Sequence, residues 1–247
     1  PPGEPAADRW EHVFMKGEKE GTTYYNWETL ASGLAGVWAR ENTRESVWDA
    51  FKRKEVYATT GSRITVRVFG GWDFTADEVE RQDFADRGYD SGVPMGGDLT
   101  AAPKGKSPAF MIRALRDPDN ANLDRIQVVK GWLKANGKTE ERIYDVTCSD
   151  GRKIVKRRCK SPVGNTVNVA EASYTNTIGD PLLTAFWKDP DFNPDQRAFY
   201  YVRVLEIPKP TWQAYDAKRY GVKMSKDVPM VVQDRAYTSP IWYTPGS

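Results

Sequence analysis

The chain has 247 residues, and its 36 lysines and arginines nearly balance its 34 aspartates and glutamates, for a formal net charge of +2. This balance gives no electrostatic basis for binding nucleic acid or an anionic membrane surface. No apolar run reaches the roughly 20 residues that a membrane-spanning helix needs. Aromatic residues form 12% of the chain, and because they favour pleated, half-buried surfaces we expect a fold made mainly of strands.

The first 32 residues are polar, contain several Gly and Pro, and carry scattered aromatic side chains. This composition favours an irregular arm. The chain begins with PPGEPAADRW and has no initiator methionine, so we expect it to be a piece of a longer protein.

A helix is predicted from Thr43 to about Lys54. Asn42 and Glu45 are three positions apart, as in a capping box at a helix start. The basic residues at the other end of the segment suit the C-terminus of a helix, because they complement its dipole.

Strands are predicted on both sides of a small-polar turn. VYATT (56–60) is apolar and β-branched, and in 64–72 the apolar Ile64, Val66 and Val68 alternate with Thr65 and Arg67. Alternation with period two indicates a strand with one buried face. A helix that is followed directly by a strand is typical of α/β structure.

The remaining segments predict further strands. Residues 75–92 suggest one or two short helices and 93–99 a loop, whereas 107–117 and 123–148 suggest three strands, two of them joined by an Asn136-Gly137 hairpin turn. We expect a long loop over 165–197, a strand over 198–207, a helix from 211 ending at Gly221, and a last strand over 239–244. The predicted fold class is therefore mainly β with some α: a β-sandwich-like domain over 64–247, preceded by an α/β remnant over 1–63.

Cys148 and Cys159 are separated by a polar segment with an Asp150-Gly151 turn. They favour a disulfide bond, and such bonds persist in oxidising compartments. Two free buried thiols are the alternative. Because the chain has only two cysteines and no histidine near them, it lacks the usual spacing of zinc ligands.

The stretch TTGSRI carries the candidate binding residues. Thr59, Thr60 and the backbone around Gly61 can donate to an anionic oxygen, and Arg63 can pair with a phosphate or carboxylate. Equally, Gly61 can form a plain turn while Arg63 satisfies a neighbouring acid. His12 is the only histidine, so we expect no catalytic residue and no metal site within this chain.

A family resemblance extends over nearly the whole chain. It is carried by the segment from GLAGVWARENTRESVWDAFKRKEVYATTGSRI through VRVFGGWDF, VPMGGDL and NTIGDP to DPDFNPDQRAFYYVRVLEIPKPTW and AYTSPIWYTP. These motifs resemble the bacterial family catalogued as domain of unknown function 3604. That family is similar to the PHP (polymerase and histidinol phosphatase) phosphoesterases, which are distorted α/β barrels that bind divalent metals.

The resemblance implies that residues 1–63 hold the last helix and strand of such a barrel, and that 64–247 form an accessory domain. The His-rich motifs would lie upstream, so a divalent metal (zinc, manganese or iron) is expected only in the intact protein. Thr59, Thr60, Gly61 and Arg63 match the family's ATTG-x-R segment, in which Ser62 replaces a frequent proline. The implied partners are the N-terminal part of the same protein and a small anionic ester, in a periplasmic or secreted setting.

Two other interpretations stay open. The chain could be a β-sandwich module that binds a glycan or a protein surface, with Trp132, Trp187, Trp212 and Trp242 as candidate stacking residues. Tryptophans on one open face would favour that interpretation, whereas buried ones would favour a scaffold. The chain could also be a purely structural lid or dimer surface.

Overall fold

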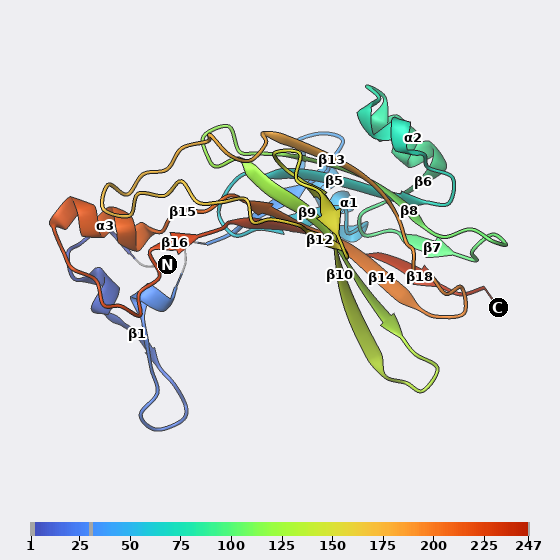
Figure 1. Cartoon of the computed structure of the whole chain (residues 1–247). Helices are drawn as coiled ribbons and strands as arrows, with labels where there is room; N and C mark the ends of the chain where they lie inside the picture. Colours follow the sequence, from blue (N-terminus) through green and yellow to red (C-terminus); the bar gives the residue numbers. More distant parts are fainter. Residues whose placement is uncertain (1–2, 30–31, 247) are drawn as a thin grey trace.

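The computed structural model describes residues 3–29 and 32–246 and consists mainly of antiparallel strands (Figure 1). The larger sheet has eight strands. Six follow one another in the order β10 (Thr139–Cys148), β9 (Leu123–Leu133), β14 (Ala198–Glu206), β17 (Arg235–Thr238), β4 (Val56–Thr59) and β3 (Leu34–Val37). The other two are β18 (Ile241–Thr244), which pairs with β14, and β7 (Asp98–Thr100), which lies parallel to β18.

A smaller sheet packs against the larger one. Its order is β13 (Leu182–Lys188), β8 (Ala109–Leu115), β5 (Thr65–Gly71) and β6 (Gly92–Pro94). Inward-facing residues of both sheets, such as Val66 and Ile112 on one and Val128 and Val202 on the other, form one buried core. Alternating side chains from two facing sheets make a β-sandwich core, so the predicted mainly β fold is confirmed.

Short elements surround the sandwich. The helices are α1 (Arg44–Lys52), α2 (Phe84–Ser91) and α3 (Trp212–Tyr220), with 3-10 turns η1 (Arg9–Glu11), η2 (Asn26–Glu28) and η3 (Ala76–Glu80). Three two-stranded ladders pair β1 (Val13–Lys16) with β2 (Thr23–Tyr25), β11 (Ile154–Val155) with β12 (Arg158–Cys159), and β15 (Lys209–Pro210) with β16 (Val231–Val232). Among the described residues, no helix is long and apolar enough to cross a membrane.

Several predicted elements are confirmed. Ile64, Val66 and Val68 are all buried, as the alternation indicated. The β9–β10 hairpin closes through a hydrogen bond from the Lys134 backbone N–H to the Lys138 carbonyl, with Gly137 at φ 78°. Gly221 ends α3 in the left-handed conformation, where glycine carries no Cβ penalty.

Other predictions were wrong. Residues 182–188 form β13 rather than part of a long loop, because this apolar run pairs along its whole length with β8. The predicted irregular arm contains the β1–β2 ladder, and the predicted loop 93–99 contributes to β6 and β7. The cap of α1 is Thr43 rather than Asn42, because the Thr43 side chain accepts from the backbone N–H of Ser46.

The expected barrel remnant is not seen in the described residues. β4 lies between β3 and β17 and is antiparallel to both, so residues before position 64 belong to the same sheet as the rest of the sandwich. The connection from β4 to β5 crosses from the larger sheet to the smaller one. The boundary predicted between residues 63 and 64 falls on this crossing.

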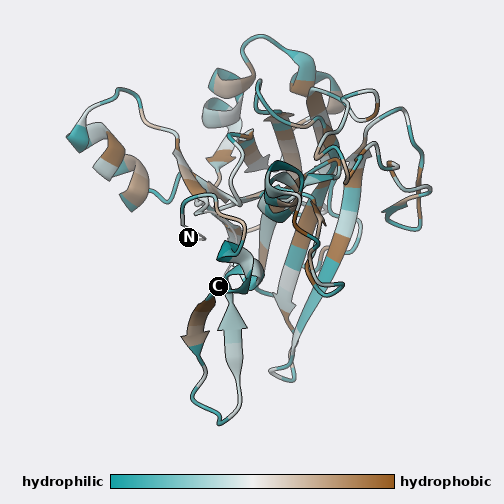
Figure 2. Ribbon diagram, turned by 90° about the vertical axis from the view of Figure 1, so that its left-hand side faces the viewer, coloured by the Kyte–Doolittle hydropathy of each residue, from teal (hydrophilic) through white to brown (hydrophobic). Residues whose placement is uncertain are grey.

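Helix α1 is poorly covered. Ala50 is its only buried residue, whereas Trp48 is 61% exposed and Phe51 46% exposed. Figure 2 shows this helix at the left, standing apart from the two sheets and carrying hydrophobic bands. The neighbouring strand β3 is the end strand of the larger sheet, with β4 as its partner in the described part of the chain.

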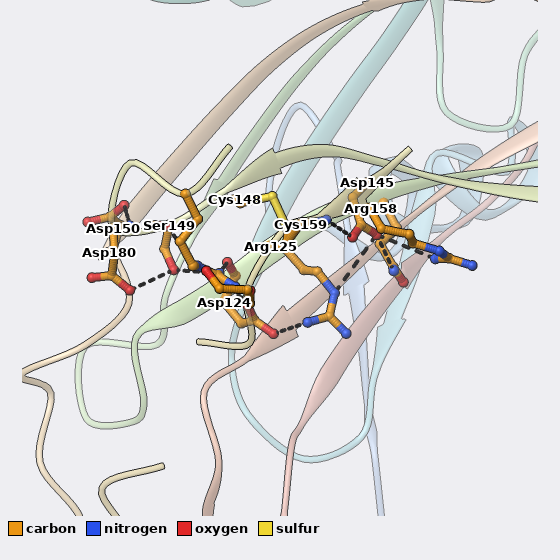
Figure 3. The surroundings of a disulfide bond; sticks show 12 residues. Asp124, Arg125, Asp145, Cys148, Ser149, Asp150, Arg158, Cys159 and Asp180 are labelled. Atoms are coloured by element: carbon orange, nitrogen blue, oxygen red, sulfur yellow. Dashed lines mark hydrogen bonds and ion pairs between the residues drawn. A yellow bond between two sulfur atoms is a disulfide. The ribbon is translucent and has the colours of Figure 1, made fainter. Parts of the chain in front are cut away.

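The predicted disulfide is present. Cys148 at the end of β10 is bonded to Cys159 in β12, with their Cα atoms 6.1 Å apart. Beside it, the buried Asp145 accepts hydrogen bonds from the Cys159 backbone N–H (2.8 Å) and from the Gln127 amide (2.6 Å) (Figure 3). The disulfide therefore ties a short excursion of the chain back onto the edge of the larger sheet.

Replacing both cysteines by serine should lower the free energy of unfolding by about 3 kcal/mol, because the bond no longer restricts the unfolded chain. Urea denaturation of both proteins measures this difference. Reductant should destabilise the wild type and leave the double variant unchanged. Equal stability of the two oxidised proteins would show that the bond does not stabilise the fold.

Candidate functional site

Three buried carboxylates from distant parts of the chain lie near the crossing from β4 to β5, and Asp234 and Asp117 bind it through hydrogen bonds. Asp117 follows β8, Glu206 ends β14 and Asp234 precedes β17. All three are at most 8% exposed. Burying an acid is costly unless the charge is paired or hydrogen-bonded, so the partners of each acid determine what this site can do.

Asp234 anchors the start of the crossing. The Thr60 hydroxyl donates to Asp234 Oδ1 at 2.6 Å and accepts from the backbone N–H of Arg235 at 3.0 Å. Thr59 is buried in β4, and its hydroxyl accepts from the Gly61 N–H at 3.4 Å. Gly61 has φ 153°, a conformation that L residues rarely adopt, so the glycine is needed for the chain to turn here.

Asp117 anchors the end of the crossing. Its carboxylate accepts from the backbone N–H of Arg63 at 2.8 Å and from Arg63 Nε at 3.3 Å. Burial alone would raise the pKa of Asp117, but the hydrogen bonds from the Arg63 and Asp119 backbone amides and from the guanidinium lower that pKa overall. The carboxylate therefore stays charged at neutral pH.

The Arg63 guanidinium is 63% exposed and contacts a second acid, since its Nη2 lies 2.5 Å from the Oδ2 of the surface residue Asp119. Hydrogen bonds and charge from Asp117 and then Asp119 raise the pKa of Arg63. Any anion that binds Arg63 must share it with these two carboxylates.

Glu206 is fully buried. The ammonium of Lys209 is 3.4 Å from Glu206 Oε2, but it lies closer to Asp234 (2.6 Å) and to the Asn120 amide oxygen (2.8 Å). Within the described residues, neither carboxylate oxygen of Glu206 and no side-chain oxygen of Ser62 has a hydrogen-bond partner. Burial raises the pKa of Glu206 to about 7, although Lys209 opposes this shift.

The structure thus brings Thr59, Thr60, Gly61 and Arg63 together with a polar group that the sequence did not indicate. That group consists of Asp117, Asn120, Glu206, Lys209 and Asp234. Glu206 and Lys209 lie in the motif LEIPKP, and this charged pair at and just after the end of a mostly apolar strand was the available signal. The role of the four predicted residues in binding a substrate stays a prediction.

The described residues offer one group of potential metal ligands, Asp145 with Cys148 and Cys159. The two sulfur atoms are bonded to each other, so they are not thiolates and do not suit a metal ion. His12 lies at the surface, with its Nε2 3.2 Å from Asp8.

The four candidate tryptophans do not share a face. Trp132 and Trp187 pack against the core, and the Trp212 indole N–H donates to the Thr29 carbonyl. Trp242 alone is exposed, at 44%. It lies beside Phe199 in a groove of about 670 Å³ that is also lined by Trp132. The binding-module interpretation now depends on this groove and stays a prediction.

The chain belongs to the family described as protein of unknown function (DUF3604), whose sequence model matches residues 4–245. No curated protein matches the chain. Family membership is therefore established over nearly the whole length, whereas the relationship to the PHP phosphoesterases and the position of the chain within a longer protein are proposals.

Glu206→Gln should flatten the pH dependence of stability. Because the pKa of Glu206 is raised in the folded protein, its protonation stabilises the fold fully below about pH 4.5, and this contribution is lost as pH rises through about 7. The amide carries no charge, so between pH 5 and pH 8 the stability of the variant should rise relative to the wild type by roughly 3 kcal/mol.

Chemical denaturation at both pH values measures the change, and Glu20→Gln, at an exposed position, is the control. If the free energies of unfolding of Glu206→Gln and of the wild type changed equally between pH 5 and pH 8, Glu206 would already be charged at pH 5.

Proposed function

We propose that this chain of the DUF3604 family is the C-terminal part of a metal-dependent hydrolase of small anionic esters, and that it is inactive alone. The metal centre belongs to the N-terminal part of the same protein. The described residues of this chain do not supply a ligand set for zinc, manganese or iron, so no catalytic step is assigned to them.

The uncovered face of α1 carries the proposal. Trp48 and Phe51 are large apolar side chains, and Leu34 on the adjoining β3 is also 44% exposed. A hollow of about 650 Å³ is lined by residues 42–51 alone. Exposed apolar patches of this kind, next to the end strand of a sheet, are typical of surfaces that another part of a protein covers.

We propose the upstream part of the same protein as the occupant of this surface. In the PHP-like resemblance, the segment from Asn42 to Gly61 adjoins the hydrolase domain, so α1 and the neighbouring end strand β3 would contact that domain directly. Docking there would bring the crossing 60–63 close to the upstream metal centre. Arg63 would then contribute a guanidinium to the binding of an ester anion.

The disulfide supports a compartment in which such bonds persist. Cytosolic thiols are usually kept reduced, whereas periplasmic and secreted proteins retain disulfides. We therefore assign the protein to the periplasm or the cell exterior as part of the proposal.

Trp48→Asp tests whether α1 is covered. In the 247-residue chain the side chain is exposed, so the free energy of unfolding should change by less than about 0.5 kcal/mol. In the intact protein a buried, unpaired carboxylate should destabilise the contact by at least about 2 kcal/mol. Denaturation of both proteins measures the effects.

Tyr215→Asp on α3 is the matched control, because Tyr215 is 50% exposed and helix α3 lies far from α1 in the fold (Figure 1). It should be neutral in both proteins. Equal effects of Trp48→Asp in the two proteins would rule out a covering segment over α1.

Arg63 and Asp119 form a pair that tests substrate binding. With p-nitrophenyl phosphate and the intact, metal-loaded protein, Arg63→Ala should raise KM about 10-fold, because a charged hydrogen bond to the anion is lost. Asp119→Asn should lower KM, because it removes a competing carboxylate from Arg63. Steady-state kinetics measures both.

A purely structural role for Arg63 predicts a different pattern. Both variants would then lower stability and leave KM unchanged, and the crossing would be removed from the proposed substrate site. Absence of any metal-dependent hydrolysis by the intact protein would contradict the proposed reaction itself.

A further inference from the structure

Two arginines lie side by side on the outer face of the smaller sheet. Arg67 of β5 is directly opposite Arg113 of β8 in the antiparallel register. Both side chains line the same cavity of about 450 Å³. Like charges directly opposite each other on neighbouring strands destabilise a sheet, so this pairing calls for a compensating charge.

Carboxylates of the described chain offset the positive charge of these two arginines only in part. The buried Glu55 is shared between Arg67, at 3.8 Å, and Arg53, at 3.3 Å. In the described part of the chain no carboxylate lies within 4.0 Å of the Arg113 guanidinium, which instead donates to the backbone carbonyls of Val79 and Arg81. The carboxylate of Glu80 accepts a hydrogen bond from the hydroxyl of Thr184, which is the residue opposite Arg113 on β13.

Aromatic rings fix the two guanidinium groups. The Arg67 guanidinium lies 4.3 Å from the ring centre of Trp38, and that of Arg113 lies 4.4 Å from the ring centre of Phe84. Arg67 Nη2 donates to the Tyr89 hydroxyl, but its buried Nε has no partner among the described residues. A guanidinium held against an aromatic ring is preorganised to contact an anion with its remaining N–H groups.

The cavity has an apolar end next to this cationic row. Leu115 of β8 and Leu182 of β13 are opposite each other, and both line the cavity although they are 47% and 49% exposed. They lie two residues along the strand from the arginine row, which corresponds to about 7 Å. Thr65 and Gln82 add polar groups at the wall.

We propose that this cavity binds a small organic anion, with a carboxylate or phosphate group between Arg67 and Arg113 and an apolar body on Leu115 and Leu182. The volume suits a ligand about the size of one aromatic ring with its anionic group. The site lies on the outer face of the smaller sheet, and it does not depend on the proposed hydrolase function.

Calorimetric titration of the metal-free chain with phenyl phosphate and with benzoate tests the proposal and separates the two anionic groups. Phenol, which lacks the charge, and inorganic phosphate, which lacks the ring, are the reference probes. At least one of the two aromatic anions should bind at least about 10-fold more tightly than both references. Binding should weaken as salt increases.

Two variants locate the site. Arg67→Gln should weaken binding of the aromatic anion at least about 10-fold, whereas Arg235→Gln on the larger sheet should have no effect. Leu182→Ser, at a half-exposed position that leaves the fold intact, should weaken binding of the aromatic anion and leave that of inorganic phosphate unchanged.

No saturable binding of either aromatic anion would overturn the proposal. So would binding as tight for phenol as for the anions, or an aromatic-anion affinity that Leu182→Ser does not change. Because only binding by this chain is measured, these outcomes are independent of whether the intact protein hydrolyses esters.

Discussion

The crossing of the chain from the larger sheet to the smaller one depends on two buried carboxylates, Asp234 and Asp117. Asp234 accepts a hydrogen bond from Thr60, and Asp117 accepts from both the backbone and the side chain of Arg63. The buried Glu206 lies near Lys209, which also contacts Asp234. Asp117 follows β8 of the smaller sheet and Asp234 precedes β17 of the larger one, so the crossing can take this course only when both sheets are assembled. The conformation of the candidate loop therefore depends on the packing of the two sheets against each other.

Local sequence patterns predict much of the fold but little of the candidate site at the crossing. The alternation at Ile64, Val66 and Val68, the Asn136-Gly137 turn and the glycine after α3 are each determined by neighbours a few residues away, so the sequence predicted them. β13 was missed because its seven residues lie between two Asp-Pro pairs and resemble a loop. The hydrogen bond from Thr60 to Asp234 joins residues 174 positions apart, and no periodicity reports such a contact.

Two surfaces, around α1 and around Arg67 and Arg113, carry exposed or incompletely paired side chains of different kinds. Around α1 the excess is apolar, with Trp48 and Phe51 exposed beside the end strand β3, and a further part of the protein is the occupant that we propose. Around Arg67 and Arg113 the excess is positive charge beside two exposed leucines, and a small anion fits that combination. The buried polar group at the crossing supports the loop that lies between the two sheets.

The central claim is that this chain completes a larger hydrolase by docking through α1 and β3. Hydrogen exchange of the 247-residue chain, compared with the same residues in the intact protein, tests it most directly, because exchange reports the opening of each backbone N–H. The account predicts that amides of 34–37 and 44–52 are strongly protected only in the intact protein, with the β9 and β14 amides equally protected in both. Identical exchange of these segments in the two proteins would contradict the account.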